Sequence, residues 1–225
     1  AGTEAMKQRL QCAAVAIAAL LMTICAIEIG LRTLAPDEFV PVVERDLALG
    51  WRGRAGVSCT YRHALSGIAF PVEHNERGFR DLAGRTREGT GKTRVLCVGD
   101  SFTWGWGVDE EQIYSAVLEG ILRKRGEDVE VLNAGVPGYN TVQCLLYLEQ
   151  RGLLLSPDVV VYQASDNDLS GNLPPDPGGV WAYPYARLSG DGVPVVEGTP
   201  LPKLGIMDGL KYWSARHLRL AYLLR

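Results

Sequence analysis

The sequence predicts an α/β fold with a parallel sheet between two helical layers, a three-layer α/β/α domain. A short and nearly all-apolar run at residues 94–98 is typical of a strand that is buried on both faces of a parallel sheet, and the runs at residues 129–133 and 158–163 predict two further strands. Helical patterns at residues 113–125 and 141–151 separate these runs. Alternation of strands and helices favours parallel strands joined by right-handed crossovers. An N-terminal transmembrane helix and a small β-rich region are expected to precede this domain.

Composition and charge describe an ordinary globular chain with attachments. The 225 residues are 47% hydrophobic and 22% charged, and the formal net charge is -3. No basic stripe interleaved with aromatic residues is present, so the sequence gives no electrostatic reason to expect a nucleic-acid partner.

The first 36 residues are predicted to anchor the protein in a membrane. Residues 12–27 carry no charge, and Lys7 and Arg9 precede them. With its flanks this segment can cross a bilayer, and the basic flank would keep the N-terminus cytoplasmic and place the following chain outside the inner membrane. A cleaved signal peptide is less favoured because no small-x-small site follows the apolar run. A buried core helix is less favoured because the run is apolar on all sides.

Residues 37–92 are interpreted as a small β-rich lead-in region. His63 and His74 lie in possible strands, and we expect partly exposed structural histidines rather than metal ligands or bases. Residues 86–93 imitate a phosphate-binding P-loop, but the first glycine of that motif is missing and Gly-Lys-Thr precedes a strand instead of opening a helix. This segment is interpreted as a solvated linker, which argues against an ATPase.

The five cysteines do not suggest a disulfide framework or a metal site. Cys12 and Cys25 fall in the apolar segment and leave an odd number for the rest of the chain, namely Cys59, Cys97 and Cys144. Cys97 and Cys144 are expected to be small buried hydrophobes. No Cys/His spacing indicates zinc, and no cofactor is expected.

Polar or glycine-rich turns follow all three predicted strands. Gly99, Asp100 and Ser101 follow the first, residues 133–138 the second and residues 165–168 the third. In open α/β sheets the chemistry collects at the carboxyl ends of the strands, so Ser101 is a candidate nucleophile. The alternative is that Ser101 only caps the helix that follows it.

The helix expected after this turn has Ile113, Val117, Ile121 and Leu122 on one face, which we expect to be buried.

Aromatic residues and a hairpin flank the predicted site. Trp104 and Trp106 would either line a substrate groove or pack over the first turn of the helix. Residues 185–188 and 193–196 predict a β-hairpin, which would either shape the pocket or form a surface flap.

Taken together, the three turns resemble the motifs of the SGNH, or GDSL, hydrolase family. Gly99-Asp100-Ser101 matches its nucleophile block, residues 133–138 its glycine block, and Asn167-Asp168 the last two residues of its Gly-x-Asn-Asp block. The resemblance covers about residues 93–168 and implies an SGNH-hydrolase, flavodoxin-like fold for residues 93–225.

The lead-in region carries a weaker resemblance. Gly50-Trp51 and residues 75–81 are similar to a segment of membrane-anchored relatives, in which a small β element packs beside the hydrolase domain.

The resemblance also implies a mechanism and its residues. Ser101 would attack an ester carbonyl and form an acyl-enzyme. The oxyanion would be held by the backbone N–H groups of Ser101 and Gly138 and by the side-chain amide of Asn167. Asp100 and Asp168 would order their turns rather than transfer protons.

Two departures from the family pattern stand out. Ser165 occupies the position of the family's glycine, which adds a side chain beside the oxyanion site. No Asp-x-x-His block is present, and His217 lacks an aspartate three residues before it, so it is interpreted as structural. We expect the sequence to be a fragment whose catalytic histidine and aspartate lie beyond Arg225.

The sequence therefore predicts a membrane-anchored, extracytoplasmic serine esterase that acts on acyl esters, with O-acetylated glycans as candidate substrates. One alternative is an O-acyltransferase of envelope or extracellular polysaccharide, because transfer and hydrolysis share the acyl-enzyme. The other is a non-catalytic, membrane-anchored SGNH-like binding or scaffold module.

Overall fold

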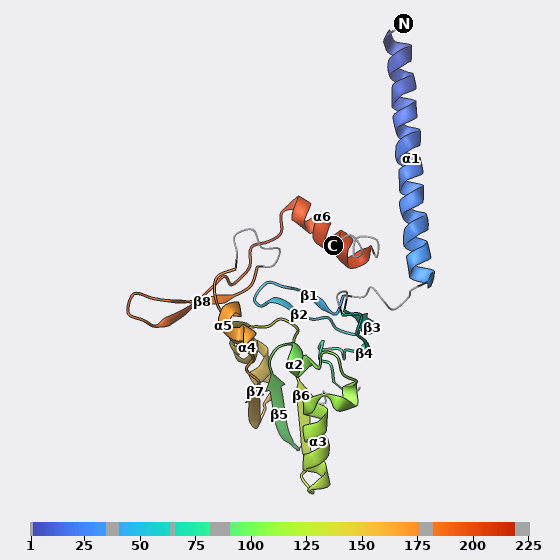
Figure 1. The fold of residues 1–225 in the computed structure, drawn as a ribbon. Helices are drawn as coiled ribbons and strands as arrows, with labels where there is room; N and C mark the ends of the chain where they lie inside the picture. Colours follow the sequence, from blue (N-terminus) through green and yellow to red (C-terminus); the bar gives the residue numbers. More distant parts are fainter. Residues whose placement is uncertain (1, 35–40, 64–65, 82–90, 176–181, 219–225) are drawn as a thin grey trace. The chain divides into compact units, whose positions relative to one another are not determined.

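The computed structural model describes residues 2–34, 41–63, 66–81, 91–175 and 182–218, which belong to two compact units (Figure 1). One unit comprises Ala1–Phe39 and Leu204–Arg225, and the other comprises Val40–Lys203.

The first unit contains the long N-terminal helix α1 and the helix α6. α1 spans Gly2–Leu34, a length of about 50 Å, and α6 spans Ile206–His217. Thr3–Leu34 is long and apolar enough to cross a membrane. Its apolar side chains are exposed on all sides, in agreement with the sequence pattern. Near its end, Glu28 and Arg32 form an ion pair of 2.8 Å one turn apart.

A three-stranded parallel sheet forms the centre of the second unit. β5 (Thr93–Val98) lies between β6 (Val129–Asn133) and β7 (Val159–Tyr162), in the order β6-β5-β7. The expected strands and their parallel direction are therefore confirmed.

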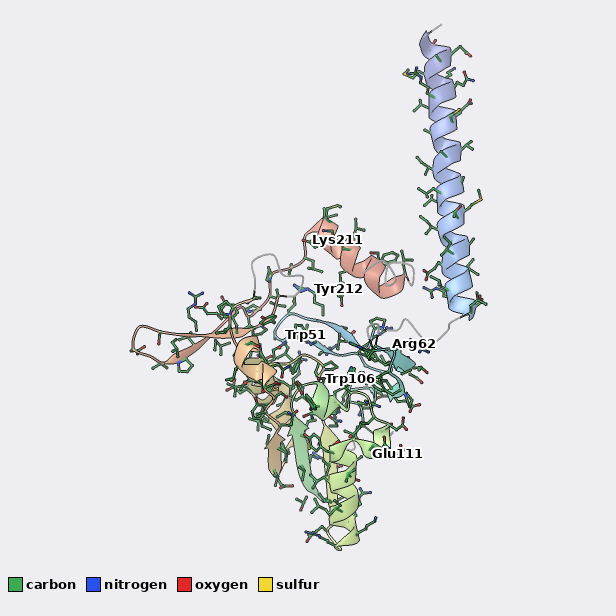
Figure 2. All side chains as sticks on the ribbon, viewed as in Figure 1. Trp51, Arg62, Trp106, Glu111, Lys211 and Tyr212 are labelled. Atoms are coloured by element: carbon green, nitrogen blue, oxygen red, sulfur yellow. The ribbon has the colours of Figure 1, made fainter. Side chains whose placement is uncertain are left out.

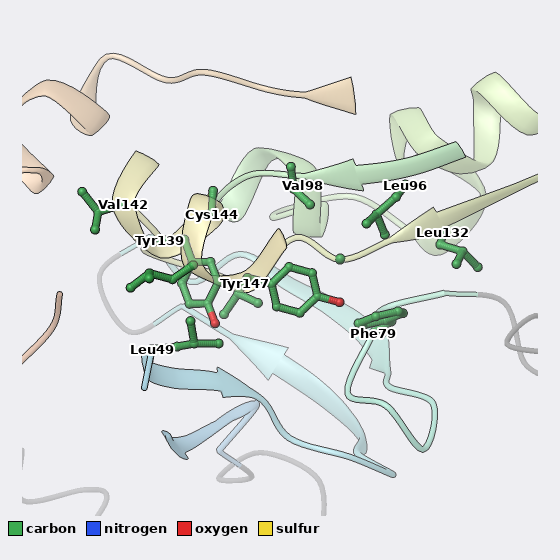
Figure 3. Close-up of a cluster of buried hydrophobic side chains, with 12 residues drawn as sticks. Leu49, Phe79, Leu96, Val98, Leu132, Tyr139, Val142, Cys144 and Tyr147 are labelled. Carbon is green, nitrogen blue, oxygen red and sulfur yellow. The ribbon is translucent and has the colours of Figure 1, made fainter. Parts of the chain in front are cut away.

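Helices cover the two faces of this sheet. On one face, α3 (Tyr114–Lys124) packs against a buried cluster of strand residues, Val95, Cys97, Val129 and Val131. On the other face, α4 (Thr141–Tyr147) contributes to the largest cluster, shown in Figure 3. α4 continues as a π turn, η2 (Leu148–Gly152), and a 3₁₀ turn, η3 (Leu153–Leu155).

The expected buried face of α3 is partly wrong. Ile113 is buried, but Val117 and Ile121 are 45% and 46% exposed. Leu122 packs on the sheet as expected, and Tyr114 and Leu118 pack there in place of Val117 and Ile121. Ile113 is the N-cap of α3 and does not belong to its helical turns. The helix face that packs on the sheet is therefore rotated relative to the face expected from a helix that begins at Ile113.

The lead-in region forms two antiparallel hairpins. β1 (Val43–Asp46) pairs with β2 (Gly50–Gly53), and β3 (Ser58–Arg62) pairs with β4 (Ala69–Glu73). Buried side chains of this region form a cluster together with Trp104 of α2. The members of the cluster are Val42, Val57, Cys59, Phe70, Val72 and Trp104.

Trp104 and Trp106 take part in packing, which is one of the two expectations for them. Trp104 is 1% exposed, and Trp106 packs against the same cluster.

Three short helical elements and one hairpin complete the second unit. These are α2 (Ser101–Trp104), η1 (Glu110–Gln112), α5 (Asn167–Gly171) and the hairpin of β8 (Tyr185–Leu188) with β9 (Pro194–Glu197). The predicted hairpin is thus present, and its residues Leu188 and Val195 are largely exposed. Most of the P-loop-like segment at residues 86–93 lies outside the described residues.

Candidate active site

The carboxyl ends of the three parallel strands bring the three predicted turns to one edge of the sheet. Backbone hydrogen bonds continue past the strand ends. The N–H of Val136 donates to the carbonyl of Gly99 at 3.1 Å, and the N–H of Gln163 donates to the carbonyl of Val98 at 3.0 Å. The turn at Ser101 is therefore flanked on one side by the glycine turn, residues 133–138, and on the other by the turn that contains Asn167.

Ser101 begins the single-turn helix α2 and does not cap it. The cap is Asp100, whose Oδ1 accepts from the N–H of Phe102 at 2.9 Å. The interpretation of Ser101 as a helix cap is therefore wrong. As the first residue of α2, Ser101 keeps a backbone N–H without an intrahelical acceptor. Gly105 ends the turn with a φ of 90°, a conformation that favours glycine.

Two glycines of the second turn are required for different reasons. A Cβ on Gly135 would lie 2.3 Å from the backbone nitrogen of Trp104, so glycine allows this loop to approach the α2 backbone. Gly138 is exposed and has a φ of 77°, whereas a Cβ there would meet only Trp51 at an ordinary 3.5 Å. Gly138 is therefore set by its backbone conformation rather than by crowding.

The third turn is ordered by Asp168. This carboxylate is 6% exposed, and its Oδ2 accepts from the hydroxyl of Tyr162 at 2.8 Å and from the N–H of Ser165 at 2.9 Å. Ser165 thus takes part in the turn through its backbone. Its Oγ also accepts from the side-chain amide of Gln163 at 2.7 Å. Asn167, the next residue of the motif, is exposed at the start of α5.

Side chains that the motifs do not include join the second and third turns. Asn140 donates from Nδ2 to the carbonyl of Gly171 at 2.6 Å, and the hydroxyls of Thr141 and Tyr162 lie 3.0 Å apart. Asn140 also caps α4 in a capping box with Gln143, a spacing that the sequence itself displays. No local sequence pattern predicts the contacts of Tyr162, because its hydroxyl meets Thr141 and Asp168, which lie in two different helices, α4 and α5.

Tyr162 is a hydrogen-bond donor to Asp168. Burial, together with this hydrogen bond, raises the pKa of the Tyr162 phenol to about 12. The phenol therefore stays protonated at neutral pH.

The groups expected to bind the oxyanion are not engaged by other described residues. Within the described ranges, no hydrogen bond uses Oγ or the backbone N–H of Ser101, the backbone N–H of Gly138 or the side-chain amide of Asn167. Asp100 is 2% exposed, and its Oδ2 has no hydrogen-bond partner among these residues.

His74 is buried, which corrects the expectation of a partly exposed side chain. It is 5% exposed, its Nδ1 donates to the carbonyl of Arg54 at 2.9 Å, and its Nε2 accepts from Nε1 of Trp104 at 2.9 Å. Burial lowers the pKa of His74 to about 4, so the imidazole is neutral at pH 7.

Of the other two histidines, only His63 has a described side chain. His63 follows β3, and its Nδ1 accepts from the N–H of Ser66 at 3.2 Å. The side chain of His217 lies outside the described residues.

The remaining titratable groups give no sign of a metal site or a reactive thiol. The described part of the chain contains no group of three or more His, Cys, Asp or Glu residues that could hold a metal ion. Cys59, Cys97 and Cys144 are buried and are not in disulfides. Burial raises the pKa of Cys97 to about 11 and that of Cys144 to about 12, so both stay protonated at neutral pH.

Comparison with known proteins relates this chain to lipases and esterases. The model of the GDSL-like lipase/acylhydrolase family matches residues 97–222. An arylesterase of Vibrio mimicus is 30% identical over 82 residues, which make up 36% of this chain and 41% of the arylesterase.

Solved structures of an esterase are also similar in sequence. AlinE4, an SGNH-hydrolase family esterase, is 33% identical over 38% of this chain and 47% of its own, with a TM-score of 0.31. A single-residue mutant of AlinE4 is 31% identical over 36% of this chain and 46% of its own, with a TM-score of 0.30. The chain thus spans less than half of the length of these relatives.

Proposed function

Because the chain belongs to the GDSL-like lipase/acylhydrolase family, we propose that it is a serine esterase that forms an acyl-enzyme on Ser101. The observation that carries the proposal is the arrangement of the three turns at one sheet edge. They present a serine hydroxyl, two backbone N–H groups and one amide, none of which is engaged by other described residues.

The proposed reaction begins with attack of Oγ of Ser101 on an ester carbonyl. The carbonyl oxygen gains negative charge, which the N–H groups of Ser101 and Gly138 and the amide of Asn167 would stabilise. The alcohol leaves, and water then attacks the acyl-enzyme and releases the acid. An asparagine amide suits this site because it donates without carrying a titratable charge.

Asp100 and Asp168 have supporting roles in this proposal. Asp100 caps α2 and so fixes the start of the helix at Ser101. Asp168 holds the turn that presents Asn167, through its hydrogen bonds to Tyr162 and Ser165.

Removal of the Ser101 proton needs a base. His74 does not fit this role because both of its ring nitrogens are engaged in buried hydrogen bonds. We assign the base to none of the described residues.

We further propose that α1 anchors the protein in a membrane and that the catalytic unit is extracytoplasmic. Its length and composition support a membrane span. Lys7 and Arg9 at its N-terminal end favour a cytoplasmic N-terminus.

The proposed substrate class is an acyl ester, with O-acetylated glycans as candidates for the natural substrate. Transfer of the acyl group to a sugar hydroxyl remains the alternative outcome of the same acyl-enzyme. Adding a glycan acceptor to the assay separates them, since a transferase would yield acylated glycan and a hydrolase free acid.

A direct test measures hydrolysis of p-nitrophenyl acetate by the full-length protein and its Ser101→Ala variant. We expect the variant to lose at least about 1,000-fold in kcat, because the nucleophile is gone. Ser66→Ala, at an exposed serine, is the matched control and should retain wild-type activity. A Ser101→Ala variant that hydrolyses the ester at the wild-type rate would refute the nucleophile assignment. A wild-type protein that does not accelerate hydrolysis would favour a non-catalytic module.

A further inference from the structure

The helix that begins at Ser101 is a single turn, and so short a helix does not hold its own geometry. α2 contains four residues, Ser101–Trp104. The first turn of a helix fixes more backbone dihedral angles than its few hydrogen bonds repay. The position of Ser101 therefore depends on the contacts that hold the far end of this turn.

Arg80 holds that far end. Arg80 is 1% exposed, and its Nη1 donates a hydrogen bond to the backbone carbonyl of Gly105. Its Nη2 donates to the carbonyl of Val108 at 2.6 Å and to that of Pro71, in β4, at 2.8 Å. One planar guanidinium thus ties the segment after Ser101 to the lead-in region.

The same guanidinium stacks on the aromatic side chain that ends α2. The Cζ of Arg80 lies 5.1 Å from the ring centre of Trp104 and 5.0 Å from that of Phe70. The indole N–H of Trp104 donates to His74. Burial lowers the pKa of Arg80 to about 10, so the side chain remains charged at neutral pH.

Trp51 makes the equivalent contact to the glycine turn. Its Nε1 donates to the carbonyl of Pro137 at 2.9 Å, and its own carbonyl accepts from the hydroxyl of Tyr139 at 2.7 Å. These two contacts fix the residues on both sides of Gly138. Trp51, labelled in Figure 2, comes from β2 of the lead-in region.

We propose that Arg80 and Trp51 are positioning residues that align Ser101 with the backbone N–H of Gly138 for catalysis. The inference rests on the proposed esterase function. Both residues precede the family match, which starts at residue 97. Through these two residues, the lead-in region contacts two of the turns that would bind the transition state.

The test compares kcat and KM of the full-length protein with those of the Arg80→Lys and Trp51→Phe variants on p-nitrophenyl acetate. Lysine keeps the charge but cannot reach several carbonyls with one planar group. Phenylalanine keeps most of the ring but loses the donor to Pro137. We expect kcat to fall about 10-fold or more in Arg80→Lys and about 3- to 10-fold in Trp51→Phe, with KM within about twofold.

Controls separate positioning from folding. Arg62→Lys alters an exposed arginine of β3, labelled in Figure 2, and should leave kcat unchanged. The active fraction of each preparation is counted by titration, so that unfolded protein does not enter kcat. If Arg80→Lys does not fold, Trp51→Phe decides, because its ring still packs against Tyr139 and Tyr183.

Each outcome has a distinct meaning. Active wild-type protein with unchanged kcat in Trp51→Phe and in folded Arg80→Lys would overturn the positioning role and leave the proposed function standing. A wild-type protein whose turnover does not depend on Ser101 would overturn the proposed function and this inference together.

Discussion

At the scale of single residues, buried polar groups hold the turns of the candidate site. Asp168 accepts two hydrogen bonds while 6% exposed, and neutral His74 is fixed by one donor and one acceptor. A buried polar group that loses its partner costs more free energy than the bond itself contributes. Substitutions at these positions should therefore lower the stability of the folded protein by measurable amounts.

Asp168→Ala should destabilise the second unit by about 3 kcal/mol, because it leaves the Tyr162 hydroxyl and the Ser165 N–H without their acceptor. Tyr162→Phe removes only one of these bonds and should cost about 1 kcal/mol. Urea denaturation of both variants measures the difference. Equal costs would show that Asp168 does not order the turn through both contacts.

Stability should fall as the pH is lowered because of His74. Its pKa of about 4 in the folded protein is below the ordinary value of 6.5, so the unfolded chain binds the proton first. The contribution is fully present above about pH 6.5 and is lost as the pH falls towards 4. Between pH 7.5 and 5 the loss should be about 2 kcal/mol.

Urea denaturation at the two pH values, compared between wild-type protein and His74→Gln, measures this contribution. Glutamine cannot take up a proton, so the variant should lose about 2 kcal/mol less than the wild type over this range. Equal pH dependence in the two proteins would mean that His74 is not buried in its neutral form.

At the scale of elements, the site depends on how closely the glycine turn approaches α2. Gly135 faces the α2 backbone at a distance that admits no Cβ, and Gly138 needs a positive φ. Gly135 thus allows the glycine turn to approach α2, the helix that begins at Ser101.

Gly135→Ala should therefore be costly. Its Cβ would lie 2.3 Å from the backbone nitrogen of Trp104, so α2 and the glycine turn must separate. We expect a loss of about 1–3 kcal/mol in stability, together with a lower kcat. Gly120→Ala, in α3, meets nothing within 4 Å and should be neutral or stabilising. A Gly135→Ala variant as active and stable as Gly120→Ala would contradict the close packing.

The strands can be predicted from the sequence, whereas the helix faces and the supporting contacts are less predictable. Apolar runs predict β5, β6 and β7 to within a residue, although the side chains of β7 are largely exposed. Helical periodicity predicts the buried face of α3 only in part, because it does not show where the helix starts. Contacts such as Trp104 with His74 join residues 30 positions apart and leave no local signal.

At the scale of the whole molecule, an apolar helix and an α/β unit are joined in one chain. The family match covers residues 97–222, and the three turns contain the groups that the proposed chemistry would need. The motifs for Ser101, Gly138 and Asn167 could be predicted because each lies in a short segment at a strand end. Their roles in catalysis remain proposals.

Removal of residues 1–36 should release the protein from membranes. The full-length protein should resist extraction by alkaline carbonate, because α1 is long and apolar enough to span the bilayer. The shortened protein should be recovered in the soluble fraction. Carbonate extraction of the full-length protein would show that α1 does not act as a membrane anchor.

Whether Ser101 carries the acyl group can be read from the protein itself by mass spectrometry of the trapped acyl-enzyme. Full-length protein is mixed with p-nitrophenyl acetate, quenched in acid within milliseconds and digested for peptide mapping. We expect an added acetyl group on the peptide that contains Ser101, and none on the Ser101→Ala variant. An acetyl group on another residue, with Ser101 unmodified during turnover, would show that Ser101 is not the nucleophile.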